Sequence, residues 1–220
     1  PGNLHLILLA GILLVFFVTA AFFAINLKRN ITPDESSHIY MSELFSSTLG
    51  IPEYTEQSLK FGYSELGRMP FLYFWLNGRI LNGLNLLSPE IPEWPQILVL
   101  RFTSVLYSLL TLIFCYLLTR EITESKWWPL LATFMLANTL MFTFLSGGVT
   151  YDNLSNLCAS AAIFYLLRVV KGKSFTANSL AWLVFISTGV LVKITIFPLA
   201  GLTGAIWLFH TLKHRKEIKL

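Results

Sequence analysis

Two adjacent acids and a histidine, Asp34, Glu35 and His38, lie in the stretch ITPDESSH at residues 31–38. A carboxylate within reach of a hydroxyl proton can act as a general base. A histidine one helical turn after an acid lies on the same face of a helix. Because a long apolar run ends just before these residues, they stand where the chain would leave a membrane. The pattern predicts a site for proton transfer at a membrane surface.

Helix capping is the alternative explanation of the same residues. Thr32 and Glu35 fit the capping-box pattern, and Pro33 suits the first position of a helix. Acids near a helix N-terminus are also stabilised by the helix dipole. Capping accounts for Glu35 better than for Asp34, and it does not account for His38. The sequence alone leaves both interpretations open.

The composition is that of a membrane protein. The 220 residues are 55% hydrophobic and only 13% charged, with a mean hydropathy of +0.64, whereas soluble domains are about one quarter charged. Residues 4–26 contain no acid, lysine or arginine. At a rise of ~1.5 Å per residue they can cross a hydrocarbon core of ~30 Å. They exceed the core of a secretory signal and no small-residue cleavage site follows, so we expect a permanent membrane helix.

Apolar runs and flanking charges place the remaining spans. They are expected at residues 98–119, 127–145, 153–170, 179–195 and 197–212. Residues 179–212 are too long for one crossing, and Lys193 with Pro198 marks the break. The sequence therefore predicts an all-α polytopic transmembrane helix bundle of about six spans. We expect residues 1–220 to form a single membrane module.

Charge asymmetry predicts the orientation. An even number of spans places both termini on one side, where residues 168–173 and 213–219 are basic, while residues 28–97 carry eight acids against five bases. The positive-inside rule then makes both termini cytoplasmic and the loop at 28–97 external, in the cell (inner) membrane. The basic ends explain the net charge of +4, so no nucleic-acid partner is expected. Cys115 and Cys158 lie in apolar runs and do not indicate a disulfide framework.

The long external loop is expected to carry structure of its own. Residues 33–49 and 70–87 are predicted to form helices, and the aromatic residues of the second suit the membrane interface. The segment between them is rich in turn residues. Loops of this size are more often functional than plain connections.

Further charged residues lie near the external ends of the predicted spans. Arg101 is at the start of the second span, Asp152 at the start of the fourth and Lys193 at the turn between the last two. Arg101 could extend to the membrane surface, and Asp152 could cap a helix beside Asn153. Lys193 is flanked by apolar residues, and an intramembrane charge is by default a functional hypothesis.

The order of these features resembles a known family. The first span is followed by PDExxH, RMPFLYFWLNGRIL, LRFTSVLYSLLTLIFCYLLTRE, FLSGGVTYDNLSNLCASAAIFYLLR and TGVLVKITIFPLAG. Over nearly the whole chain this order resembles the N-terminal module of GT-C membrane glycosyltransferases. It is most similar to the protein O-mannosyltransferase and aminoarabinose-transferase branch and to related bacterial membrane proteins. Enzymes of that branch are generally longer, so the expected alternatives are the N-terminal part of a longer protein, one half of a split enzyme completed by a partner chain, and a short relative that has lost activity.

The resemblance implies transfer of a sugar from a lipid-phosphate-linked donor to an acceptor outside the cytoplasm. It places the catalytic base at Asp34, with Glu35 as its neighbour. Arg101 and Lys193 match basic positions suited to the donor phosphate, and Asp152 matches a second acid near the substrate. The candidate substrate-binding residues are His38, Arg68, Arg101, Tyr151, Asp152 and Lys193.

Other functions are compatible with the same residues. Asp34 and His38 at i,i+4 could offer two metal ligands, but a protein site needs three or four. We therefore expect no resident cofactor, and a divalent ion held loosely at a lipid phosphate stays open. A non-catalytic scaffold or lipid-binding subunit, or a small transporter, is the rival class. Transporters commonly show repeats and polar sites at the membrane midplane, whereas here the charged residues gather at one membrane face. The expected partners at that face are membrane lipids and a lipid-linked sugar donor.

Overall fold

The computed structural model describes residues 4–50, 52, 70–88 and 91–214. Regular structure in these residues is entirely helical, which confirms the predicted all-α class. The turn-rich segment of the predicted loop, including Arg68, lies outside the described residues.

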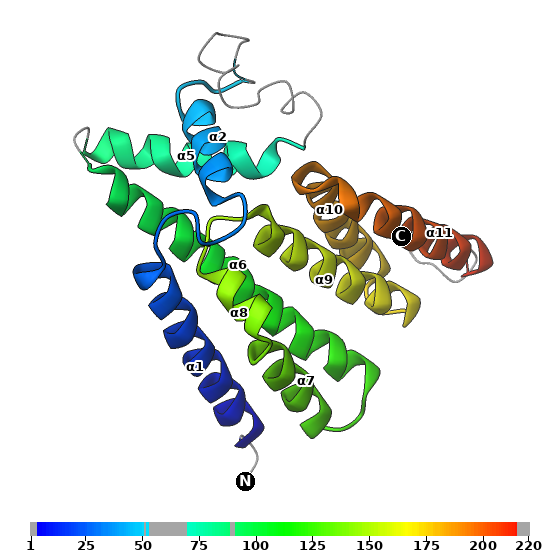
Figure 1. Ribbon diagram of the computed structural model, residues 1–220. Coiled ribbons are helices and arrows are strands. Elements are labelled where there is room, and N and C mark those ends of the chain that lie inside the picture. The colour runs from blue at the N-terminus through cyan, green and yellow to red at the C-terminus, as the bar shows by residue number, and fades with distance from the viewer. Residues whose placement is uncertain (1–3, 51, 53–69, 89–90, 215–220) are drawn as a thin grey trace.

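Long apolar helices make up most of the molecule (Figure 1). They are α1 (Leu4–Asn26), α6 (Glu93–Ile122), α9 (Tyr151–Val170), α10 (Phe175–Val192) and α11 (Phe197–His214). In the described part of the chain, five helices are long and apolar enough to cross a membrane. Two shorter helices, α7 (Trp127–Ala137) and α8 (Leu140–Ser146), give a sixth span if they are counted together. The protein is thus a multi-pass membrane protein, as its composition predicts.

A bend divides the span expected at residues 127–145 into the helices α7 and α8. The axes of α7 and α8 differ by 67°. At the break, the Asn138 side-chain amide donates to the Phe134 carbonyl at 2.8 Å, and the Thr143 hydroxyl donates to the Ala137 carbonyl at 2.9 Å. The Phe134 carbonyl also keeps its helical bond from the Asn138 N–H, so the side chain that acts across the break is that of Thr143, which satisfies the Ala137 carbonyl at the end of α7.

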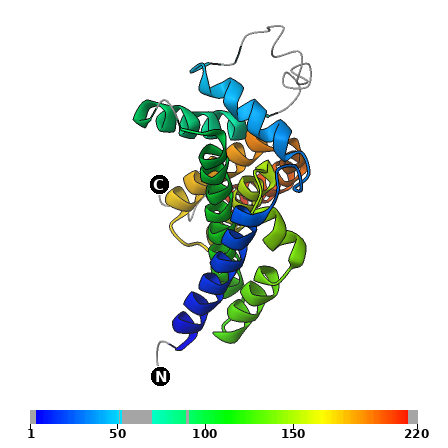
Figure 2. The ribbon, with the colours of Figure 1, turned by 60° about the vertical axis from the view of Figure 1, so that its left-hand side comes forward.

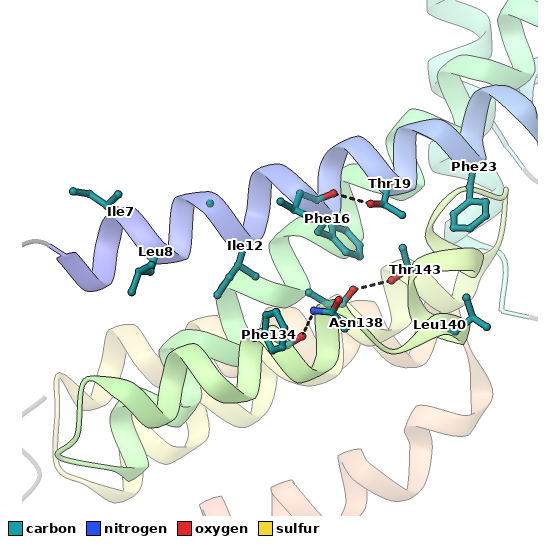
Figure 3. Close-up of a pocket in the computed structure, with 13 residues that line it drawn as sticks. Ile7, Leu8, Ile12, Phe16, Thr19, Phe23, Phe134, Asn138, Leu140 and Thr143 are labelled. Carbon is teal, nitrogen blue, oxygen red and sulfur yellow. Dashed lines mark hydrogen bonds between the residues drawn. The ribbon is translucent and has the colours of Figure 1, made fainter.

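The bend leaves an apolar groove of about 660 Å³ between α1 and the α7–α8 pair (Figure 3). Its lining residues are Ile7, Leu8, Gly11, Ile12, Val15, Phe16, Thr19, Phe23, Phe134, Ala137, Asn138, Leu140 and Thr143. The Thr19 hydroxyl donates to the Val15 carbonyl of its own helix at 2.9 Å. Because its polar groups are bonded in this way, the groove presents a surface that suits the hydrocarbon of a bilayer.

The predicted break between the last two spans is confirmed. Lys193 is extended, with φ −151°, and ends α10. A short 3-10 turn, Ile194–Ile196, follows it. Pro198 then lies in the first turn of α11, where its missing N–H costs no helical hydrogen bond.

The helices α2 (Glu35–Ser46) and α5 (Leu72–Leu87) lie at one end of α6, and the start of α1 lies at the other end (Figures 1 and 2). Both α2 and α5 are somewhat shorter than predicted. A Cβ at Gly78 would lie 2.7 Å from the Phe45 carbonyl carbon, so only glycine permits this contact between the helices. The Arg79 guanidinium also donates to the carbonyls of Phe45 and Thr48, which satisfies the end of α2.

A buried apolar cluster lies beneath α2 and α5. Its buried members are Ile39, Met41, Phe45, Tyr73, Phe74, Leu81, Ile97, Leu100, Val149, Leu154, Leu157, Cys158 and Val192. They come from α2, α5, α6, α9 and α10 and from the segment before α9. Because close-packed interiors resist displacement, this cluster fixes α2 relative to the long helices.

Candidate functional site

The Arg101 guanidinium holds both carboxylate oxygens of Glu35. Arg101 Nε donates to Glu35 Oε1 at 2.8 Å, and Nη2 donates to Oε2 at 2.9 Å. Both side chains are 0% exposed. This two-point geometry is the strongest that an arginine and a carboxylate can form. Burying either charge alone would cost free energy, and the opposite charge of the partner offsets that cost.

Arg101 also binds the end of α1. Its Nη1 donates to the carbonyls of Ala24 and Leu27, each at 2.8 Å. The guanidinium carbon lies 5.3 Å from the centre of the Trp94 ring. These contacts exclude the interpretation that Arg101 merely extends to the membrane surface, because its side chain points into the protein and its charge is used there.

The Glu35 carboxylate accepts two further hydrogen bonds from the backbone. The Val149 amide donates to Oε1 at 3.1 Å, and the Asn30 amide donates to Oε2 at 3.3 Å. The pair of Glu35 and Arg101 thereby joins the end of α1, the start of α2, α6 and the segment before α9. Four segments of the chain are thereby held at one point.

Two glycines let the segment before α9 approach this point. A Cβ at Gly147 would lie 2.6 Å from Phe23 Cβ, and a Cβ at Gly148 would lie 2.3 Å from Thr32 Oγ1. A larger side chain at either position would force the segment away from α1 or from Thr32. Our sequence analysis did not assign these glycines a role. The adjacent pair in SGGVTYD was the signal that could have indicated it.

The capping-box interpretation of Thr32 and Glu35 is wrong. The helix begins at Glu35, its N-cap is Asp34, and Pro33 lies before the helix instead of at its first position. The Thr32 hydroxyl is buried and has no hydrogen-bond partner within the described residues. The Glu35 carboxylate is drawn to Arg101, which explains why the pattern does not operate as a cap.

Asp34 has an unusual backbone and an exposed side chain. Its φ of 58° and ψ of 9° lie in the left-handed region, which aspartate and asparagine tolerate better than most residues. Within the described part of the chain its carboxylate makes no capping hydrogen bond. The backbone turn directs Asp34 outward while the next residue is buried. Backbone strain of this kind is concentrated at functional sites.

His38 is buried one turn along α2 and contacts the segment before α9. Its Nδ1 lies 3.0 Å from the Val149 carbonyl oxygen. Because a carbonyl only accepts, Nδ1 carries the hydrogen and Nε2 is the acceptor nitrogen of the ring. Burial lowers the pKa of His38, while the Val149 carbonyl and the charges of Asp34, Asp152 and Glu35 oppose that shift. His38 is therefore neutral at pH 7 and lies within electrostatic range of all three acids.

Asp152 and Lys193 form a second ion pair, which is partly exposed. The Lys193 ammonium contacts Asp152 Oδ1, and their side chains are 26% and 35% exposed. The ammonium also lies 4.8 Å from the centre of the Tyr151 ring. The N-cap of α9 is Thr150, whose hydroxyl accepts from the Asp152 amide at 3.3 Å. Asp152 therefore does not serve as the cap, and its carboxylate is paired with the lysine.

The Tyr151 ring contacts both His38 and Lys193: its centre lies 4.6 Å from the His38 ring centre and 4.8 Å from the Lys193 ammonium. The structure thus brings His38, Tyr151, Asp152 and Lys193 together, with Asp34 and Glu35 beside them at the start of α2. Within the described residues, no group of three or more His, Cys, Asp or Glu side chains could hold a metal ion. A divalent ion at this site would need a donor phosphate to complete its ligands.

One comparison with known proteins gave a match. Residues 93–219 match the family described as dolichyl-phosphate-mannose-protein mannosyltransferase, a match over more than half of the chain. It includes Arg101, Asp152 and Lys193, and it begins after the segment that carries Asp34. Neither the curated proteins nor the solved structures gave a match. The chain belongs to the dolichyl-phosphate-mannose-protein mannosyltransferase family of GT-C membrane glycosyltransferases.

Proposed function

We propose that this glycosyltransferase moves a sugar from a polyprenyl-phosphate donor to an acceptor at the membrane surface where α2 begins. The observation that carries the proposal is that two consecutive acids have different environments. The Glu35 carboxylate is held by Arg101. Asp34, whose backbone is left-handed, is exposed beside it. A helix cap would use the Asp34 side chain for the helix itself, whereas here the carboxylate faces outward and is available to an acceptor.

In the proposed step, Asp34 is the general base. Its carboxylate takes the proton of an acceptor hydroxyl while the acceptor oxygen attacks the anomeric carbon of the donor sugar. The bond between that carbon and the phosphate oxygen breaks, and its electron pair leaves with the polyprenyl phosphate. Glu35 acts as a positioning residue, because its contacts fix the backbone on which Asp34 is held.

Lys193 is the proposed contact for the donor phosphate. Its partly exposed ammonium can hold the charge that develops on the leaving phosphate. Asp152 holds that ammonium in the absence of donor, and Tyr151 supplies an aromatic face beside it. Arg101 contributes through Glu35, because its Nε, Nη1 and Nη2 are already bonded within the protein.

We further propose that this surface is external. Basic residues cluster at the opposite end of α6, where Arg120 lies near Lys171 and Lys173 of the chain after α9. The positive-inside rule assigns such an end to the cytoplasm. Asp34 and Lys193 would then face the compartment in which a lipid-linked sugar, and not a nucleotide sugar, is the available donor.

A donor panel tests the proposal. The full protein in native membranes should transfer label from at least one polyprenyl-phosphate sugar to an acceptor and none from nucleotide sugars carrying the same sugar. Membranes from cells that lack the gene provide the background. Transfer from a nucleotide sugar would contradict the donor class. An absence of transfer across the panel, with the protein present and folded, would favour a non-catalytic lipid-binding role.

A further inference from the structure

A second cluster of charges lies at the end of α6 far from Asp34. Its centre is Glu121, whose carboxylate is contacted by the Lys173 ammonium at 2.7 Å and 3.0 Å. The Arg168 guanidinium lies 3.6 Å from the same carboxylate. Lys171 donates to the Glu121 backbone carbonyl. Three basic side chains from the end of α9 and the following turn thus surround one acid.

The position of this cluster along α6 places it at the opposite membrane surface. Arg101 and Glu121 are separated by 20 residues of one continuous helix, which at ~1.5 Å per residue is ~30 Å, the thickness of a hydrocarbon core. Trp127 and Trp128, which follow α6 almost directly, are 61% and 59% exposed. Exposed tryptophans mark the headgroup level of a membrane. The cluster therefore lies where phospholipid headgroups lie.

The cluster lines a hollow of about 330 Å³. Its lining residues are Leu117, Arg120, Glu121, Phe164, Arg168 and Lys173. Three of them are basic and one is acidic, so the hollow keeps an excess of positive charge after Glu121 is paired. An excess of basic side chains in a concave site favours an anionic ligand.

Arg168 supplies a second observation that points to a ligand. Its Nε is buried and has no hydrogen-bond partner among the described residues. Its distance of 3.6 Å to Glu121 is too long for a hydrogen bond. The guanidinium carbon lies 5.5 Å from the centre of the Phe164 ring, which orients the group without using its donors. Because Nε has no accessible surface, an anionic ligand would contact the terminal nitrogens of this side chain, which is 34% exposed and makes no hydrogen bond to Glu121.

Pairing of basic side chains with helix C-termini explains part of this cluster. Lys171 does so directly, through the Glu121 carbonyl. Binding to helix C-termini does not explain why Arg120, Arg168 and Lys173 line one hollow. It also does not explain why the Arg168 Nε has no hydrogen-bond partner among the described residues. The positive-inside rule accounts for basic residues at this end of α6, but it does not require three of them to line one hollow.

We propose that this hollow binds a phosphate group, carried by the headgroup of an anionic phospholipid. Arg168 and Lys173 would contact the phosphate oxygens, and Arg120 would contribute charge at the rim. The site is independent of the proposed sugar transfer, because it lies at the other membrane surface and shares no residue with the site at Asp34. Failure of either proposal therefore leaves the other unaffected.

Lipid titration of the purified full protein tests the proposal. The probes are phosphatidylglycerol, phosphatidylcholine and inorganic phosphate, each added to protein in a neutral detergent, with binding followed by native mass spectrometry and thermal unfolding. The Arg168→Gln/Lys173→Gln variant removes two cations of the hollow. Lys126→Gln is the matched control, because Lys126 is exposed at the same end of α6 and does not line the hollow.

We expect wild type and Lys126→Gln to bind phosphatidylglycerol alike, and the double variant to bind it at least about tenfold more weakly, because it lacks two of the cations that attract the anionic headgroup. Phosphatidylcholine should bind more weakly to wild type than phosphatidylglycerol does. Protection by inorganic phosphate equal to that by phosphatidylglycerol would support a phosphate site with a soluble ligand. Equal phosphatidylglycerol binding by the double variant and wild type would overturn the proposal.

Glu121→Gln separates ligand binding from a purely structural role. Removing the carboxylate frees Lys173 and Arg168, so phosphatidylglycerol binding should be kept or strengthened even if the protein loses some thermal stability. Loss of lipid binding in a folded Glu121→Gln protein would show that the cluster only joins α6 to α9, which would also overturn the proposal.

Discussion

Asp34 and Glu35 are consecutive in sequence, yet the Asp34 side chain is exposed and the Glu35 side chain is fully buried against Arg101. The left-handed backbone of Asp34 makes this separation, because it turns the chain just before α2 begins. One acid is thereby fixed within the protein and the other is held at its surface. Replacement of each carboxylate by an amide should therefore affect sugar transfer at Asp34 and protein stability at Glu35.

Asp34→Asn should abolish sugar transfer and leave the protein folded. Asparagine tolerates the left-handed region as well as aspartate does, but its amide cannot accept the acceptor proton. A positioned general base contributes roughly 10²–10⁴-fold to the rate, so kcat should fall by that factor while donor binding is kept. Glu43→Gln, a half-buried acid on the same helix, is the control and should retain activity. Full transfer by a well-expressed Asp34→Asn protein would remove Asp34 from the mechanism.

Glu35→Gln should destabilise the protein. The amide cannot hold the guanidinium at two points, so Arg101 would remain buried with its charge unmatched. Breaking a buried pair in this way costs about 3–5 kcal/mol. The midpoint of thermal unfolding in detergent should fall clearly below that of wild type and of Glu43→Gln. An unchanged midpoint would mean that the pair contributes little to the fold.

Lys193→Ala should weaken binding of the donor more than it slows the chemical step. The ammonium supplies charge to a phosphate and takes no part in proton transfer. We expect the KM for the polyprenyl-phosphate donor to rise about tenfold, the equivalent of about 1.4 kcal/mol, with a smaller change in kcat. Lys28→Ala is the control for a surface lysine outside the site. A fall in kcat at unchanged KM would contradict this role.

Stability should fall as the pH drops below the ordinary pKa of histidine, about 6.5. Because burial lowers the pKa of His38 in the folded protein, the unfolded chain binds the proton first as the pH falls. Stability is therefore complete above about pH 6.5 and decreases below it, down to the lowered pKa. His38→Asn keeps a donor for the Val149 carbonyl and cannot titrate. Unfolding midpoints measured from pH 7.5 to 5 should decline more steeply in wild type than in this variant, and parallel curves would exclude the effect.

Cysteine labelling should show the two ends of α6 on opposite sides of the membrane. In a parent in which Cys115 and Cys158 are replaced by serine, Ser47→Cys after α2 should react with an impermeant thiol reagent in intact cells. Glu124→Cys after α6 should react only once the cells are opened. Both positions are exposed in the structure, so each should label in solubilised protein. The reverse pattern would invert the proposed orientation.

The fold class and most helix positions could be predicted from the amino-acid sequence alone. The length of an apolar segment directly indicates a membrane span, because a helix must cross about 30 Å of hydrocarbon without exposing backbone groups. Residues 4–26 agree with α1, and the break at Lys193 was visible as a charge beside a proline. The bend at Asn138 was not visible, because it depends on the Thr143 side chain, which bonds the Ala137 carbonyl at the end of α7.

The partners of the charged residues could be identified only from the folded arrangement of the helices. Glu35 and Arg101 are 66 positions apart, and Asp152 and Lys193 are 41 apart. Local spacing offered a cap at Thr32 as one interpretation of Glu35 and could not indicate Arg101, since a pattern within four residues cannot include a guanidinium from α6. The energy of a buried charge depends on what surrounds it in space, so the packing of α1, α2, α6 and the glycine segment determined which acid is held inside and which is exposed.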